Sequence, residues 1–133
     1  MTEDLIEHLK KFATPERFSL FKRIVEERTN YITVLLEDIY QAQNASAVLR
    51  SCDCFGIQDV HIVENKNEYS INPDVALGSS NWLNLYKYNN KEHNTEDAIN
   101  SLKNRGYRII ATTPHTNEIN LEDFNPFKLF IRP

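Results

Sequence analysis

The pattern of apolar and polar residues divides the chain into a helical start and a longer part in which strands and helices alternate. Near the start, Thr14 and Pro15 form a typical helix beginning, with a threonine cap followed by proline at the first helical position. Apolar residues then recur at three- and four-residue spacings and form one stripe: Phe18, Phe21, Ile24 and Val25. The pattern therefore predicts a helical N-terminal extension over residues 1–29, in two pieces.

From residue 30 onward, short β-prone runs are separated by helical ones. The predicted strands span residues 31–37, 59–63, 83–88 and 107–111, and the third is expected nearer the sheet edge. The predicted helices span residues 44–54, 73–79 and 94–105, with Asn94 as a cap and Gly106 as the terminating glycine. This alternation predicts an α/β fold: a mostly parallel sheet with flanking helices.

Ligands collect at the carboxyl ends of strands in such sheets, which directs attention to the loops at residues 38–43, 64–72 and 112–117. The helix that follows the first of these loops has two faces. One face should pack on the sheet: Ala45, Leu49 and Cys52. The other face is polar: Ser46, Arg50 and Asp53. Asn44 lies at the start of this helix, where it can cap the helix or present its amide to a ligand.

Two interpretations of the polar face remain open at this point. Arg50, on the early turns of a helix that follows a strand, is well placed to bind a phosphate. Alternatively, Asn44 is an ordinary cap and Arg50 pairs with Asp53 on the helix surface. Periodicity alone favours the second interpretation.

Composition narrows the possible functions. The net charge of −4 argues against a protein that coats nucleic acid through overall charge, although a local basic patch is still possible. Residues 1–30 carry equal numbers of basic and acidic side chains and are therefore the relatively basic part. The sequence shows neither a secretory signal nor an apolar run long enough to span a bilayer, so we expect a cytoplasmic protein with no membrane partner.

Cysteine and histidine residues give weaker signals. Cys52 and Cys54 are expected to be reduced thiols, since a metal site would need a second ligand pair that the sequence lacks. The spacing of the four histidines is that of neither a metal site nor a catalytic triad. His115 is expected in a strand-end loop, as a plain loop residue rather than a site residue.

The string from Leu36 to Gly56 resembles the first motif of the SpoU/TrmH family of RNA 2′-O-methyltransferases, members of the SPOUT superfamily. In that motif a strand ends in a carboxylate and is followed by Asn, small residues, Arg and finally Gly. Other segments match the family's extension, its small-residue loop with Trp, and a strand entering its cofactor region: 17–18, 27–29, 76–82 and 107–112. The resemblance covers roughly residues 15–125.

The resemblance implies methyl transfer from S-adenosylmethionine to a ribose 2′-hydroxyl, most often in tRNA, by a homodimer. Arg50 matches the arginine that acts on the hydroxyl; because an arginine of normal pKa cannot be a base at neutral pH, we expect it to orient the hydroxyl. Asn44 would support this site, and Glu37 would hold the loop or Arg50 by a charge-assisted bond. Thr112 matches a cofactor contact. RNA contacts are expected from arginines: Arg17, Arg28 and Arg50.

The family's second motif, Gly-x-Glu, and its third, which contains Ser-Leu-Asn, do not occur in these 133 residues. The expected architecture is therefore the N-terminal part of an α/β-knot fold, with residues 30–133 as an incomplete methyltransferase domain that lacks the knot-forming part. Such a chain should bind the cofactor weakly or not at all. An alternative from another class is a non-catalytic RNA-binding or dimerisation module, and a third is a small α/β domain without a nucleic-acid role.

Overall fold

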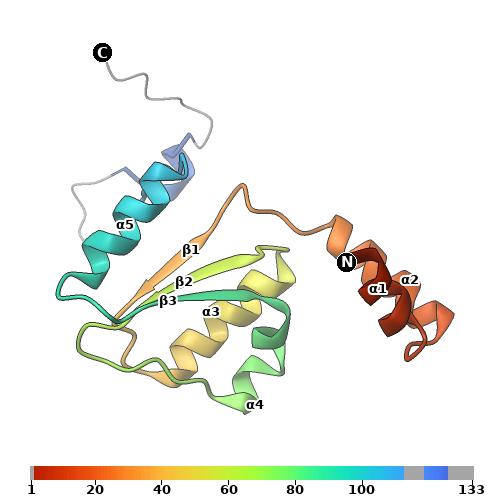
Figure 1. Cartoon of the computed structure of the whole chain (residues 1–133). Coiled ribbons are helices and arrows are strands. Elements are labelled where there is room, and N and C mark those ends of the chain that lie inside the picture. Colours follow the sequence, from red (N-terminus) through yellow and green to blue (C-terminus); the bar gives the residue numbers. More distant parts are fainter. Residues whose placement is uncertain (1, 113–118, 126–133) are drawn as a thin grey trace.

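The computed structural model describes residues 2–112 and 119–125, which form three layers with a parallel sheet in the middle (Figure 1). The strands are β1 (Val34–Glu37), β2 (Asp59–Val63) and β3 (Asn84–Tyr88). The helices are α1 (Thr2–Lys10), α2 (Pro15–Glu26), α3 (Ala42–Cys54), α4 (Pro73–Ala76) and α5 (Asn94–Asn104). Two short 3₁₀ turns complete the described elements: η1 (Ser79–Trp82) and η2 (Leu121–Asp123).

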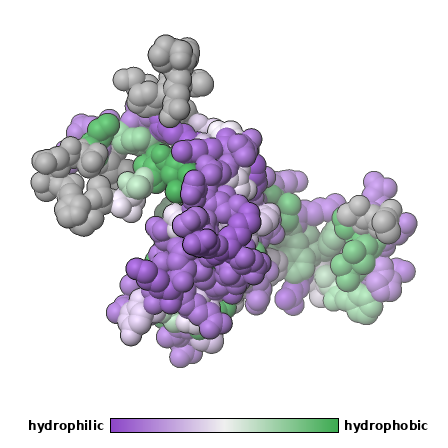
Figure 2. Space-filling view, turned by 60° about the vertical axis from the view of Figure 1, so that its left-hand side comes forward, coloured by the Kyte–Doolittle hydropathy of each residue, from purple (hydrophilic) through white to green (hydrophobic). Residues whose placement is uncertain are grey.

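The helical extension is confirmed, and it stands to one side of the sheet (Figure 1). The Thr14 hydroxyl accepts a hydrogen bond from the Arg17 amide at 3.3 Å, and Pro15 occupies the first turn, as predicted. Helix α2 has no fully buried residue, and Val25 at its end is 69% exposed. Figure 2 accordingly shows apolar surface over the helix pair. The apolar stripe is therefore only partly covered.

The sheet is parallel throughout, in the order β1-β2-β3, which confirms the predicted architecture. Val34 is paired with Val60, and Asp59 with Asn84. Strand β2 lies in the centre and all five of its residues are buried, whereas β3 lies at an edge, as expected. Strand β1 begins at Val34 rather than at Tyr31, because only residues from Val34 onward are paired with β2.

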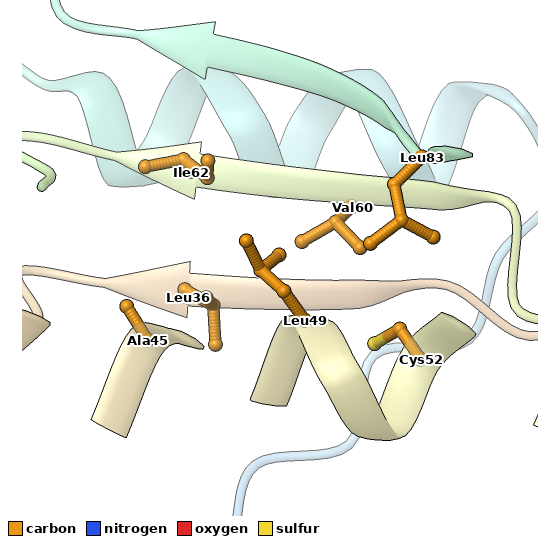
Figure 3. Packing of buried hydrophobic residues seen from close by; sticks show 7 residues of the cluster. All are labelled: Leu36, Ala45, Leu49, Cys52, Val60, Ile62 and Leu83. Atoms are coloured by element: carbon orange, nitrogen blue, oxygen red, sulfur yellow. The ribbon is translucent and has the colours of Figure 1, made fainter. Parts of the chain in front are cut away.

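Each face of the sheet is covered by helix. On one face, Leu49 and Cys52 of α3 pack against Leu36 and Val60 of the strands (Figure 3). The predicted inner stripe of α3 is thus confirmed, since Ala45, Leu49 and Cys52 are all at most 2% exposed. Helix α5 covers the other face and buries two apolar residues there: Ala98 and Leu102.

Close backbone approach attaches the extension to the sheet domain. Thr29 and Ile57 form an isolated parallel bridge, and the Thr29 amide donates to the Gly56 carbonyl at 2.8 Å. Gly56 has a φ of +73°, and a Cβ at this position would lie 2.5 Å from the Glu27 carbonyl oxygen. Glycine is therefore required here both for the left-handed backbone and for the space.

Two predicted helix details are corrected. Helix α4 ends at Ala76 because Leu77 and Gly78 both have left-handed backbone, and η1 then takes the place of the predicted loop. Asn94 is the first residue of α5 rather than its cap. Its side chain instead accepts from the Lys91 amide and donates to the Glu64 carbonyl, which fixes the loop before the helix. Gly106 ends α5 with a φ of +90°, as predicted.

The predicted strand at residues 107–111 is wrong. This segment has no regular secondary structure, and Ile109 and Ile110 are exposed. Its composition is β-prone, but a strand also requires a ladder partner, and the described residues form none with it. One contact fixes its start: the Tyr107 hydroxyl donates to the Asn30 carbonyl at 2.5 Å. Among the described helices, none is long and apolar enough to cross a membrane.

Candidate functional site

Asn44 lies inside α3 rather than at its cap. The helix begins two residues earlier, at Ala42, and Gln41 occupies the cap position without a side-chain hydrogen bond. The Asn44 backbone N–H donates to the Gln41 carbonyl in the first turn, and the Asn44 side chain is exposed. The capping alternative for Asn44 is therefore wrong, and its side chain remains available to a ligand.

Arg50 is exposed on the outer side of α3. Within the described part of the chain it forms neither a hydrogen bond nor an ion pair, so its guanidinium is available. Asp53 does not pair with Arg50, because the Asp53 carboxylate binds Arg28 instead. Asn44 and Arg50 are six residues apart, which places them about 9 Å apart along the helix and about 120° apart around it. They share the exposed side of α3 without touching.

Ser46 was expected beside Arg50 on the polar face, and this expectation is wrong. Its side chain is fully buried, where its hydroxyl donates to the Ala42 carbonyl at 2.7 Å and accepts from the Asn72 amide at 2.8 Å. A hydroxyl that satisfies both roles locally can be buried at little cost. Ser46 therefore fixes the loop before α4 against α3.

Glu37 lies at the carboxyl end of β1, where the sequence placed it, and its partner is Thr95 rather than Arg50. The Thr95 hydroxyl donates to Glu37 Oε1 at 2.6 Å and accepts from Asn65 Nδ2 at 2.8 Å. These bonds join the ends of β1 and β2 to the first turn of α5. Glu37 was expected to hold either the loop or Arg50. In the structure it contacts Thr95 of α5, which also binds Asn65 of the loop after β2.

Asp38 is a residue of this region that the sequence argument missed. Its Oδ1 accepts from three successive amides, those of Asn65, Lys66 and Asn67, at 2.7, 2.8 and 3.4 Å. These bonds, that of Lys66 first, lower the pKa of the Asp38 carboxyl below its usual value. Its φ of +47° shows that the chain is held in a strained turn here. The sequence signal that could have identified Asp38 is its carboxylate directly after a predicted strand.

The two arginines of the extension have different environments. Arg17 is exposed, and its guanidinium lies over the Phe21 ring at 5.6 Å. Arg28 is only 12% exposed, and its Nη2 lies 2.5 Å from Asp53 Oδ1. Its other terminal nitrogen, Nη1, is buried without a hydrogen-bond partner among the described residues. Arg17 therefore faces solvent, whereas Arg28 ties the extension to α3.

The described residues do not form a pocket for S-adenosylmethionine. Thr112, the expected cofactor contact, is exposed in the irregular segment after α5. His115 and the rest of that loop lie outside the described residues. Two hollows, of about 400 and 280 Å³, lie over α2 and at the start of α5, and both are open to solvent.

Metal ligands are not gathered anywhere in residues 2–112 and 119–125, where no group of three His, Cys, Asp or Glu side chains could hold an ion. Both cysteines are free thiols. Cys52 is buried in the core, and burial raises the pKa of its thiol. This agrees with the predicted packing role.

The architecture defines an α/β protein with a parallel sheet, and an exposed arginine lies on the helix after β1, where the first motif placed it. The SpoU rRNA methylase family model matches residues 31–131, so the chain belongs to this family.

Curated relatives support the same assignment. The chain is 45% identical over 126 residues to the tRNA (guanosine(18)-2′-O)-methyltransferase of Borreliella burgdorferi, which is 92% of this chain and 56% of that protein. It is 28% identical over 112 residues to the enzyme of the same name from Escherichia coli K12, which is 84% of this chain and 47% of the relative. The chain thus spans about half the length of the curated relatives it matches.

A solved structure shows the same fold. The crystal structure of the TrmH/SpoU tRNA modifying enzyme of A. aeolicus matches with a TM-score of 0.67 and 26% identity. The match covers 79% of this chain and 52% of the other.

Proposed function

We propose that this chain takes part in the S-adenosylmethionine-dependent methylation of a ribose 2′-hydroxyl in tRNA. The observation that carries the proposal is the exposed Arg50 on α3, in a motif whose family match extends over residues 31–131. The activity for which the two relatives are named supports tRNA as the substrate class. The proposal assigns the substrate side of the site to α3 and its flanking loops.

In this proposal Arg50 orients the ribose and its phosphate. A guanidinium presents several N–H donors in one plane and stays charged, which suits a phosphate or a hydroxyl oxygen better than proton abstraction. Asn44, exposed six residues earlier on the same helix, supports the same ligand with its side-chain amide. Glu37 joins the carboxyl edge of the sheet to the first turn of α5 through Thr95.

RNA contacts from the extension complete the proposal. Arg17 is exposed and is expected to contribute most, while Arg28 contributes less because Asp53 already binds it. Thr112 is proposed to contact the cofactor together with parts of the protein outside the described residues. We further propose a homodimer and a cytoplasmic location, on the grounds of the family and of the tRNA substrate.

The test is methyl transfer from radiolabelled S-adenosylmethionine to an unmodified tRNA transcript, followed by nucleoside analysis for 2′-O-methylation. Arg50→Ala should abolish any incorporation that the parent chain shows and should weaken its tRNA binding, while the exposed Lys103→Ala on α5 should change neither. Salt-dependent tRNA binding without incorporation would favour the non-catalytic RNA-binding module instead. The proposal fails if the chain neither binds nor methylates tRNA.

A further inference from the structure

A row of three side chains joins the extension to the sheet domain. The guanidinium of Arg17 lies over the Phe21 ring at 5.6 Å, and that ring meets the Trp82 ring at a tilt of 48°, with centroids 5.8 Å apart. Arg17 and Phe21 belong to α2, and Trp82 is the last residue of η1. The row therefore runs from a solvent-facing cation to an indole and joins Phe21 to a residue 61 positions later in the sequence.

The indole is held firmly and is still accessible. The Trp82 carbonyl accepts from Gln58 Nε2 at 3.0 Å, and η1 packs against α3 with Ser79 buried. On the other side, the bridge between Thr29 and Ile57 fixes the end of the extension. The Trp82 side chain is nonetheless 52% exposed, a large fraction for an aromatic residue whose backbone is fixed in place.

The chemistry of these three side chains, Arg17, Phe21 and Trp82, suits a nucleotide better than a purely apolar partner. An exposed indole offers a flat face on which an unpaired base stacks, and a nearby guanidinium attracts the attached phosphate. A second cation, Lys22, lies one residue after Phe21 on the same helix and 5.1 Å above the Phe18 ring. Helix α2 thus carries two contacts between a basic side chain and an aromatic ring, although acidic residues such as Glu16 also occur on this helix.

The location differs from that of the proposed reaction. Trp82 precedes β3 and so lies at the amino ends of the strands, whereas Glu37 closes β1 at the carboxyl ends. Arg50 is the ninth of the thirteen residues of α3 and lies between these two edges. A base that stacks on Trp82 would therefore belong to a different nucleotide from the one whose ribose Arg50 orients.

We propose that Trp82, together with Phe21 and Arg17, forms a stacking platform for an unpaired nucleobase of a structured RNA, separate from the site of methyl transfer. The inference rests on the proposed function in one respect, that RNA is the ligand. It adds a second contact point, which selects RNAs with an unstacked base at a fixed distance from the reacting ribose.

Trp82 is the single tryptophan of the sequence, so its fluorescence reports this site alone. The probes are a single-stranded RNA oligonucleotide, a fully paired RNA duplex and inorganic polyphosphate. We expect the single-stranded RNA to quench Trp82 fluorescence, and the duplex and the polyphosphate to leave it nearly unchanged. Base stacking of this kind should make Trp82→Ala bind the single strand about tenfold more weakly, measured by anisotropy of a labelled oligonucleotide.

Matched variants separate stacking from folding. Trp82→Phe keeps a ring and should retain affinity within about twofold, since every aromatic face can stack on a base. Arg17→Ala, which is exposed, should weaken binding and flatten its salt dependence, while Lys103→Ala should bind as the parent chain does. Circular dichroism checks that each variant is folded.

The outcomes are distinguishable. If the parent chain binds RNA but Trp82 is not quenched and Trp82→Ala binds equally well, the platform is refuted while the proposed function stands. If Trp82→Ala instead changes the self-association of the chain, measured by sedimentation, without changing its RNA affinity, the surface around Trp82 contacts protein. The platform is then refuted as well. If the parent chain does not bind RNA at all, the proposed function and the platform fail together.

Discussion

Arg28 Nη2 lies 2.5 Å from Asp53 Oδ1, and this ion pair joins the end of the extension to the last turn of α3. Asp53 could have paired with Arg50, which precedes it by three residues on the same helix. Because Asp53 binds Arg28, the Arg50 guanidinium stays without a partner in the described part of the chain. The ion pair thus attaches the extension to α3 and, by occupying Asp53, leaves Arg50 available.

Breaking this ion pair should loosen the extension. Arg28→Ala is expected to lower the free energy of unfolding by about 1–3 kcal/mol, between the value of an exposed pair and that of a fully buried one. Urea unfolding of Arg28→Ala, Asp53→Ala and the double variant gives the coupling energy. Additive effects of the two substitutions would show that the contact contributes nothing.

Neighbouring residues of α3 should separate stability from function. Leu49→Ala removes a side chain that is 0% exposed and should cost about 2–5 kcal/mol. Arg50→Ala should change stability by less than about 0.5 kcal/mol, because the side chain is exposed, and yet abolish methyl transfer. Thermal unfolding with parallel activity assays checks both; a strongly destabilised Arg50→Ala would contradict the proposed role.

Two glycines with left-handed backbone provide a matched pair. Gly106→Ala adds a Cβ with no atom within 4 Å and should cost about 1–2 kcal/mol from backbone strain alone. Gly56→Ala adds the same strain and a clash with the Glu27 carbonyl, so it should cost about 1–3 kcal/mol more. Chemical denaturation of the two variants measures the difference, and equal losses would show that the extension can move away from Gly56.

His61 should make stability depend on pH. Burial lowers the pKa of this histidine, with the nearby charge of Arg105 acting in the same direction and that of Asp59 opposing it. Its Nδ1 shares a hydrogen bond with the Tyr88 hydroxyl, and its Nε2 is buried without a partner among the described residues.

The unfolded chain therefore takes up a proton more readily than the folded one. The contribution of neutral His61 to the free energy of unfolding is complete above the unfolded pKa of about 6.5. This contribution is lost as the pH falls below that value, by up to about 1.4 kcal/mol per pH unit. Unfolding curves from pH 8 to pH 5 measure this loss. His61→Phe should remove it, whereas the exposed His93→Gln should retain it; a retained loss in His61→Phe would assign the effect to other groups.

The fold was largely predictable because it follows from local patterns. Strand β2 and the inner stripe of α3 occur where apolar periodicity placed them. The segment at residues 107–111 was not predictable in the same way. Its composition is that of a strand, but pairing depends on a neighbour elsewhere in the chain, which a local pattern does not specify.

The site was predictable in its residues and less so in their partners. The motif identified Arg50, Asn44 and Glu37, yet spacing along a helix suggested Asp53 as the partner of Arg50. The true partner of Asp53 is 25 residues away, and the true partner of Glu37 is 58 residues away. Such contacts are set by the packing of whole elements, so the sequence could name the side chains but not pair them.

The register of the sheet also has a consequence for the order of folding. Val34 is paired with Val60, and Asp59 with Asn84, so each ladder closes only after about 25 intervening residues have been brought together. Closing such loops costs chain entropy before any pairing is gained, whereas α1 and α2 need only local contacts. The helical extension is therefore expected to form within microseconds, and the sheet to set the slower, rate-limiting step.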